Sequence, residues 1–326
     1  MKTNKKQTVF LICMAIVLVA VVAVILLFWN KDGGFSADFK EGEGDIIVYD
    51  GKQYEYNDHL SNFVFLGIDT REKVQEYETR DGVGQADAIF LVSLNRKEKT
   101  MQALIIPRDT MTAIRIIGLD GNDAGVTTNH INLQYAFGDG KSKSCELMKE
   151  AVSNLLYDLP IQGYCSMNMD GIPIATKTVG GVQVVVPNNT LEAVNPEFKE
   201  GAKVTITEAN AEQFVRYRDI NISQSALSRT ERQITFLEAF AAKAKAVATK
   251  DQDFAVTLLE SVEDYVVTNI GTDMYVKLME ASYEKEDIHT VPGEGVAGES
   301  FDEYHVDEEQ LYELVLQMFY KEVQDR

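Results

Sequence analysis

Histidine, cysteine and basic residues are scarce in this chain of 326 residues. The four histidines are scattered and give no histidine-rich metal-binding pattern. The 31 lysines and arginines stand against 51 acidic residues, so the net charge is −20. Because nucleic-acid phosphates are bound through basic patches, this balance argues against a nucleic-acid-binding protein.

Several common functional motifs are also missing. The chain has no internal repeat, no low-complexity tract and no Gly-x-Ser-x-Gly nucleophile elbow. Gly140–Ser142 is similar to the end of a P-loop, but Tyr135 stands where the first glycine belongs. Asp120–Gly125 is similar to a calcium loop, but Ile131 replaces the closing glutamate. Neither segment therefore predicts a nucleotide or calcium site.

One long apolar run, Val9–Trp29, lies near the N-terminus and contains 21 residues. At ~1.5 Å per helical residue it spans about 30 Å, the thickness of a bilayer's hydrocarbon core. A cleaved signal peptide has a shorter apolar region that ends at small residues, whereas this run ends in Leu-Leu-Phe-Trp. Lys2, Lys5 and Lys6 precede it, which predicts a cytoplasmic N-terminus. We expect a single-pass protein of the cell membrane with most of the chain outside the cytoplasm.

Two cysteines, Cys145 and Cys165, fall in the part of the chain expected outside the membrane. A disulfide survives in that environment. Two small buried thiols are the alternative, since spacing alone does not show that the two residues meet.

Alternating strand and helix patterns predict an α/β protein, an α-β-α sandwich around a mixed central sheet. Asp50-Gly51 separates two short segments and predicts a hairpin. The dense apolar runs are typical of strands buried on both faces. The expected strands are Phe63–Ile68, Ala88–Leu94, Gln102–Ile106, Gly163–Met169 and Val182–Val186. The expected helices are Cys145–Tyr157 after an N-cap at Ser144, Thr207 to about Arg216, Ser228 to beyond Ala246, Phe254–Tyr265, Met274–Tyr283 and Glu308–Glu322.

Charged residues stand at the ends of the first three expected strands. Asp69 and Arg71 follow the first strand, Asp87 precedes the second, and Arg108 and Asp109 follow the third. A short polar loop joins the second and third strands, so these two are antiparallel. If the first and second strands are also neighbours, all five side chains lie at one edge of the sheet. The alternative is that they are the ordinary polar residues of strand ends.

Arginines form a second group. Four of the chain's ten arginines fall within 17 residues. A capping box at Ser228 and Glu231 would place Arg229 in the first turn of the long helix. Cations are disfavoured there, and a bound phosphate would remove the conflict. An ion pair with Glu231 is the alternative. The four arginines are Arg216, Arg218, Arg229 and Arg232.

Carboxylates beside an arginine cluster suggest a phosphate compound bridged by a metal ion. Mg²⁺ takes one or two protein carboxylates together with phosphate oxygens. Phosphoryl transfer requires mainly positioning and charge neutralisation, and a carboxylate can accept the proton of an attacking hydroxyl.

The segments that carry these residues resemble the LytR–CpsA–Psr family of bacterial cell-wall glycopolymer transferases. They occur in the family's order over about residues 60–245, and the short N-terminal tail with a single anchor is also similar to that family. The segments are Phe63–Arg71, Ala86–Ser93, Ile105–Thr110, Ile131–Gly138, Val179–Val182, Phe214–Arg218 and Arg229–Gln233.

The resemblance implies a phosphotransferase that passes a teichoic acid or capsular polysaccharide from a polyprenyl-pyrophosphate carrier to a peptidoglycan hydroxyl. Asp69 and Asp87 would hold Mg²⁺, with Mn²⁺ as the alternative. Arg108 and Asp109 would be catalytic, and Asp109 would either orient Arg108 or act as the base. The helices after residue 205 would line an apolar tunnel for the polyprenyl tail. The pyrophosphate-binding residues would be Arg71, Arg108, Arg216, Arg218, Arg229, Arg232 and Gln233.

On this interpretation the chain has five parts. They are a cytoplasmic tail (1–8), a transmembrane anchor (9–29), an extracytoplasmic spacer with the short hairpin (30–59), a LytR–CpsA–Psr-like catalytic domain (60–250) and a C-terminal helical extension (251–326).

One departure from the family pattern leaves alternatives open. Many members have an acidic residue where this chain has Ala226. The protein is then a slower enzyme, an enzyme that relies on Asp219 instead, or a non-catalytic member that binds the pyrophosphate lipid without turnover. A cell-envelope regulator that attenuates transcription without binding DNA is a further alternative.

Overall fold

The structure is a computed structural model that describes residues 46–78, 82–118, 120–217, 225–248, 250–251, 254–282, 287–297 and 301–323. The predicted anchor and most of the spacer lie outside these residues. Within the described part of the chain, no helix combines the length and apolar character needed to span a bilayer.

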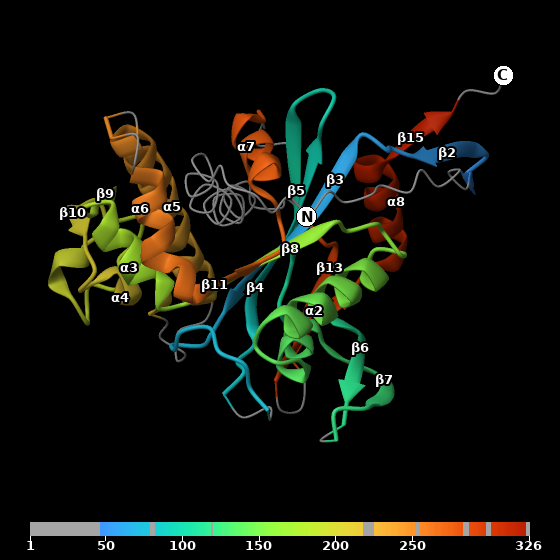
Figure 1. Ribbon diagram of the computed structural model, residues 1–326, viewed down its shortest axis with the longest axis horizontal. Coiled ribbons are helices and arrows are strands. Elements are labelled where there is room, and N and C mark those ends of the chain that lie inside the picture. Colours follow the sequence, from blue (N-terminus) through green and yellow to red (C-terminus); the bar gives the residue numbers. More distant parts are fainter. Residues whose placement is uncertain are drawn as a thin grey trace.

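A mixed six-stranded sheet forms the centre of the molecule, with the strand order β11-β8-β3-β4-β5-β12 (Figure 1). β3 pairs with β8 and β5 with β12 in parallel, and the remaining neighbours are antiparallel. The mixed α/β fold predicted from the sequence is therefore confirmed. The strands are β3 (Leu60–Ile68), β4 (Ala86–Asn95), β5 (Thr100–Ile106), β8 (Gly163–Asn168), β11 (Val266–Thr268) and β12 (Ile288–Thr290).

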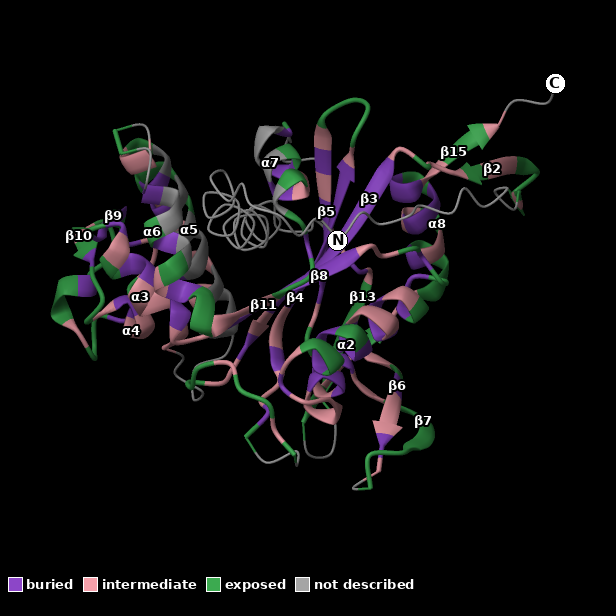
Figure 2. Cartoon of the chain, viewed as in Figure 1, coloured by how far each residue is buried: buried purple, intermediate pink, exposed green. Residues whose placement is uncertain are grey.

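Both faces of this sheet are buried, because side chains alternate between two apolar cores. Phe63 and Phe65 of β3 belong to one core, and Val64 and Leu66 to the other. Figure 2 shows the central strands as the most buried part of the molecule. The first core is covered by α3 (Gly171–Thr178), α4 (Ala211–Arg216), α5 (Ser225–Ala248), α6 (Phe254–Val262) and α7 (Thr272–Glu280), and the second by η1 (Ile131–Phe137), α2 (Ser142–Leu155) and α8 (Glu308–Phe319).

Smaller sheets surround the centre. The predicted hairpin is confirmed, with Asp50 (φ 48°) and Gly51 (φ 72°) at its turn. Two short 3₁₀ helices, η2 (Pro196–Phe198) and η3 (Glu263–Tyr265), complete the elements. The outer strands are β1 (Ile47–Tyr49), β2 (Lys52–Tyr56) and β15 (Tyr320–Val323) in one sheet, and the pairs β6 (Met111–Ile117) with β7 (Asp123–His130), β9 (Val182–Val185) with β10 (Lys203–Ile206), and β13 (Gly293–Ala297) with β14 (Asp302–Val306).

Most helix boundaries differ from the sequence prediction by a few residues, and for α2 and α8 the structure shows the cause. Helix α2 begins at Ser142, before the expected N-cap Ser144. At its N-terminal end the carboxylate of Asp139 accepts hydrogen bonds from the N–H groups of Lys141 (2.8 Å) and Ser144 (3.2 Å). Helix α8 ends at Phe319 rather than Glu322, because the following residues pair with β2 as strand β15.

The segment after residue 250 is not simply a helical extension. It supplies both edge strands of the central sheet, β11 beside β8 and β12 beside β5. It also supplies α8, which covers the second core. This segment therefore completes the same domain.

The two cysteines of the domain are free thiols. Cys165 belongs to the first core and Cys145 to the second, so the sheet separates them. Burial raises the pKa of each thiol to about 12. Of the two alternatives, the structure shows buried thiols and not a disulfide.

The docking of α8 is testable through Phe319, which is fully buried in the second core. We expect Phe319→Ala to lower the free energy of unfolding by about 3–5 kcal/mol, through lost burial and the cavity left behind. Urea denaturation measures this value. Phe301→Ala, at an exposed position, is the control. A loss as small as the control's would mean that α8 contributes little to the fold.

Candidate functional site

The ends of three strands meet at one edge of the central sheet. Ile68 at the end of β3 lies opposite Ala86 at the start of β4, and Ile89 lies opposite Ile106 at the end of β5. This edge is at the lower end of the sheet in Figure 1, away from the β4–β5 hairpin at the top. β3 and β5 flank β4, and neighbouring strands lie about 4.8 Å apart, so the axes of β3 and β5 are about 10 Å apart. The structure thus brings the five charged positions of these strand ends to one edge.

Asp69 is fixed at the end of β3 by the loop that leads into β4. Its Oδ1 accepts the N–H of Gln85 (2.7 Å), and its own N–H donates to the Gln85 carbonyl (3.1 Å). Gly84 makes this approach possible, because a Cβ there would lie 2.1 Å from Thr70 Oγ1. The glycine also has a φ of +81°. The carboxylate is therefore held in place by the backbone.

Arg108 lies between two carboxylates at the end of β5. Its Nε donates to Asp109 Oδ1 (3.1 Å), and its Nη1 pairs with Asp87 Oδ1. Burial lowers the pKa of Arg108, but the charges of Asp87 and Asp109 outweigh this effect and the net shift is upward. Asp109 is held in turn by β14, because its carbonyl accepts the N–H of Tyr304 (2.8 Å). Arg108 is thus oriented and remains partly exposed.

Arg71 and Arg216 meet at Glu212 near the end of β3. Glu212 Oε1 accepts from Arg216 Nη1 (3.0 Å) and also pairs with Arg71 Nη2. Asp170, the residue before α3, belongs to the same group of charges. Burial raises the pKa of Asp170, while Arg71 lowers it and Glu212 raises it. Glu212 was not among the predicted site residues, although its spacing of four residues from Arg216 on a helix is typical of an ion pair.

Arg232 is buried, with 1% of its surface exposed. All three nitrogens of its guanidinium have protein partners: Nε donates to the Phe214 carbonyl (2.8 Å), Nη2 to the Tyr217 carbonyl, and Nη1 to Thr190 and Asn188. Burial, followed by the charge of Arg229, lowers the pKa of Arg232 to about 10. Arg232 therefore joins α5 to the end of α4 and to the loop before η2.

The predicted capping box at Ser228 and Glu231 is wrong. Helix α5 begins at Ser225, which places Arg229 beyond the first turn. Asn188 engages both residues instead, because its Nδ2 donates to the Ser228 carbonyl (2.9 Å) and to Glu231 Oε2 (3.0 Å). Arg229 lies half-buried on α5. Arg218 and Asp219 lie outside the described residues, as do the side chains of Ala226 and Gln233.

Asn132 and Gln85 connect Arg108 with Asp69, and neither was predicted as a site residue. The N–H of Asn132 donates to the Arg108 carbonyl (3.2 Å), and its Nδ2 donates to Gln85 Oε1 (3.1 Å). Gln85 then binds Asp69 through its backbone. Asn132 is 3% exposed, and its Oδ1 has no hydrogen-bond partner among the described residues. Asn132 lies in Ile131–Gly138, one of the segments that carry the family resemblance. Its place in this segment is the signal that could have identified it as a site residue.

The carboxylates of Asp69 and Asp87 are of the type that a metal ion uses when it is shared with a phosphate ligand. The described residues contain no group of three histidine, cysteine or acidic side chains arranged to hold a metal by themselves. Asp69 and Asp87 form a pair at adjacent strand ends. Mg²⁺ suits such a pair, because it commonly takes one or two protein carboxylates and completes its shell with phosphate oxygens and water.

The sequence matches the model of the LytR_cpsA_psr family over residues 38–319, which is most of the chain. The chain belongs to this family. The LytR_cpsA_psr match includes the segment after residue 250, in agreement with the strands that this segment adds to the central sheet.

Two relatives carry the name polyisoprenyl-teichoic acid–peptidoglycan teichoic acid transferase. TagU of Halalkalibacterium halodurans is 29% identical over 214 residues, which cover 65% of this chain and 60% of TagU. TagV of Bacillus subtilis is 35% identical over 126 residues, which cover 39% of this chain and 28% of TagV. The chain thus spans less than two thirds of each relative. The crystal structure of B. subtilis TagV has the same fold, with a TM-score of 0.53, 24% identity, and coverage of 79% of this chain and 94% of the crystallised TagV chain.

The role of Arg232 as a connection within the fold is testable. Arg232→Ala leaves buried carbonyl groups of Phe214 and Tyr217 without their donor. Each unsatisfied buried group costs about 1–3 kcal/mol, so we expect the free energy of unfolding to fall by about 3 kcal/mol or more. Urea denaturation measures the loss. Arg108→Ala is the comparison and should cost less than about 1 kcal/mol, because Arg108 is partly exposed. Equal losses in the two variants would contradict this assignment.

Proposed function

We propose that this protein transfers a glycopolymer, a teichoic acid or a capsular polysaccharide, from a polyprenyl-pyrophosphate carrier to a hydroxyl group of peptidoglycan. The observation that carries the proposal is the meeting of carboxylates and guanidiniums at one edge of the sheet. Membership of the LytR_cpsA_psr family, whose relatives include named teichoic acid transferases, supports it.

The charged groups have complementary roles in this proposal. Arg71 and Arg216 on one side, and Arg108 on the other, bind the oxygens of the pyrophosphate, because guanidinium groups bind such oxygens in pairs. We assign Arg229, Arg218 and Gln233 to the same ligand by their positions in the sequence. Arg232 supports this set by holding α5 against α4. Asp69 and Asp87 would hold Mg²⁺, which when bound supplies positive charge to the phosphate oxygens.

The reaction is a substitution at the phosphorus that bears the glycan. The oxygen of the peptidoglycan hydroxyl forms a new bond to this phosphorus, and the bond between phosphorus and the oxygen of the polyprenyl phosphate breaks. The products are a phosphodiester link and polyprenyl monophosphate. Asp109 orients Arg108 through Oδ1. We assign its other oxygen as the acceptor of the hydroxyl proton.

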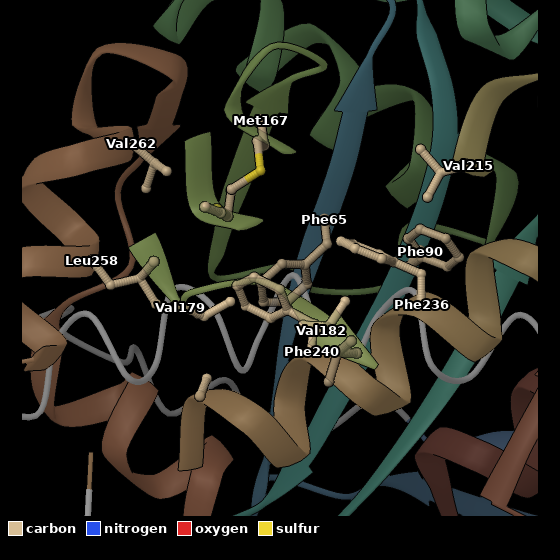
Figure 3. Close-up of a cluster of buried hydrophobic side chains, with 14 of the residues drawn as sticks. Phe65, Phe90, Met167, Val179, Val182, Val215, Phe236, Phe240, Leu258 and Val262 are labelled. Atoms are coloured by element: carbon tan, nitrogen blue, oxygen red, sulfur yellow. The ribbon is translucent and has the colours of Figure 1, made fainter. Parts of the chain in front are cut away.

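The apolar face of α5 is the proposed place of the polyprenyl tail. Arg232, Phe236, Phe240 and Ala244 follow one another at intervals of four residues, so they lie along one face of the helix. The three apolar residues belong to the first core. Figure 3 shows Phe236 and Phe240 beside Phe65 of the central sheet. A lipid with its head at the arginines would have its tail in line with this apolar face.

The proposed location is the outer side of the cell membrane, with the run Val9–Trp29 as the anchor and the N-terminus in the cytoplasm. Tethering serves the proposed reaction, because enzyme and lipid-linked donor are confined to the same surface and meet at high effective concentration.

A direct test uses the full chain in detergent with a polyprenyl-pyrophosphate-linked glycan, a peptidoglycan fragment as acceptor and Mg²⁺. We expect release of polyprenyl phosphate together with glycan transfer. Removal of the metal with EDTA should stop both, and Mg²⁺ or Mn²⁺ should restore them. Mass spectrometry detects both products. Tight donor binding without turnover would instead favour the non-catalytic alternative.

Replacement of Arg108 tests the proposed site itself. We expect Arg108→Ala to lower the rate of transfer by about 100-fold or more, since one well-placed donor to a developing charge has about this effect. Arg115→Ala is a matched control. Arg115 also pairs with two carboxylates, those of Asp123 and Glu150, but it lies on β6. Full activity of the Arg108 variant in the transfer assay would contradict its catalytic role.

A further inference from the structure

One oxygen of Glu212 binds two of the proposed pyrophosphate-binding arginines. Glu212 Oε1 lies 3.0 Å from Arg216 Nη1 and also pairs with Arg71 Nη2. The two arginines come from different parts of the fold, the loop after β3 and the end of α4. Their guanidinium groups therefore converge on a single anionic oxygen, which belongs to the protein.

A phosphate oxygen in the same place would make the same contacts with the two guanidinium groups. Carboxylate and phosphate oxygens accept the same charge-assisted hydrogen bonds from guanidinium groups. Phosphate binding to Arg71 and Arg216 therefore requires that the Glu212 carboxylate moves away. If it stayed, two negative groups would face each other at the same pair of cations.

The exchange is feasible because these ion pairs are not deeply buried. The side chain of Glu212 is 37% exposed, and Arg71 is largely exposed. Ion pairs with this exposure contribute little net free energy, so a more strongly bound anion replaces them readily. Asp170 adds a second carboxylate whose pKa responds to Arg71, Glu212 and Arg216. With two carboxylates and two guanidiniums, the group is formally neutral before a ligand arrives.

We propose that Glu212 takes the place of a phosphate oxygen in the ligand-free protein, so that a phosphate ligand binds Arg71 and Arg216 only by displacing it. The inference rests on the proposed function. Diphosphate and monophosphate headgroups meet the same competition, but the second phosphate group of a diphosphate can make further contacts that a monophosphate lacks. The released polyprenyl monophosphate therefore gives up the arginines to Glu212, which favours product release.

The test compares Glu212→Gln with the unchanged full chain, with inorganic pyrophosphate and inorganic phosphate as probes in calorimetric titrations. Glutamine keeps the size of the side chain but removes the charge. We expect phosphate and pyrophosphate each to bind about fivefold more tightly to the variant, because both displace the Glu212 carboxylate in the unchanged chain. Glu212→Ala should tighten the binding of both probes as well, and thermal unfolding checks that both variants are folded.

Glu150→Gln is the matched control, because Glu150 also pairs with an arginine and is exposed to nearly the same degree, 40% against 37%. It removes the same charge from a different part of the surface. Two results would overturn the inference. In one, Glu212→Gln weakens the binding of both probes, which would make Glu212 a residue that positions the arginines. In the other, Glu212→Gln and Glu150→Gln change the binding of the two probes equally.

Transfer assays on the same preparations separate this inference from the proposed function. Tighter probe binding by Glu212→Gln, in a protein that shows no transfer, would contradict the proposed function alone. Normal transfer with unchanged probe binding by Glu212→Gln would contradict the role of Glu212 alone.

Discussion

The pairing of β3, β4 and β5 is the constraint on which the rest of the site depends. These strands are buried on both faces, so a shift of one residue would move each side chain into the opposite core. The register is therefore fixed by packing. The same register places the last residues of β3 and β5 beside the first residues of β4. A hydrophobic requirement thus determines where the charged groups meet, although none of them belongs to a core.

A second constraint is electrostatic. The chain carries a large negative charge, and its proposed ligand is also negative. The arginines of the site are matched by nearby carboxylates: Asp87 and Asp109 for Arg108, and Glu212 for Arg71 and Arg216. Such pairing keeps the guanidinium groups together without a ligand present. It also means that binding is an exchange of anions, so the affinity reflects a difference between two sets of ion pairs.

Local signals were sufficient to predict the centre of this fold. Continuous apolar runs mark β3, β4 and β5, and the short loop after Asn95 fixes two of them as antiparallel. The meeting of Asp69, Asp87 and Arg108 at one edge follows from these two facts together with the assumption that β3 and β4 are neighbours. The structural part of the site hypothesis could therefore be reached from the sequence. The chemical roles of these residues came from the family resemblance and remain proposals.

Non-local contacts account for what the sequence did not predict. The contact of Asn188 with Ser228 and Glu231, across 40 residues or more, replaced the expected helix cap. Arg232 was expected to face a ligand, but four groups distant in the sequence surround it. The short strands β11, β12 and β15 contain only three or four residues each. Their pattern is too brief to identify, and only their partners in space define them as strands.

Strand β15 has a mechanical consequence. It pairs with β2 from Tyr320 to Val323, and Lys52 bonds Glu322 across this pair (2.9 Å). Because β2 lies between β1 and β15, tension that enters the domain through β1 loads this small outer sheet before it reaches β3. A pull on the start of the described chain would therefore have to separate β1 from β2 before it strained β3, at whose far end the charged edge lies.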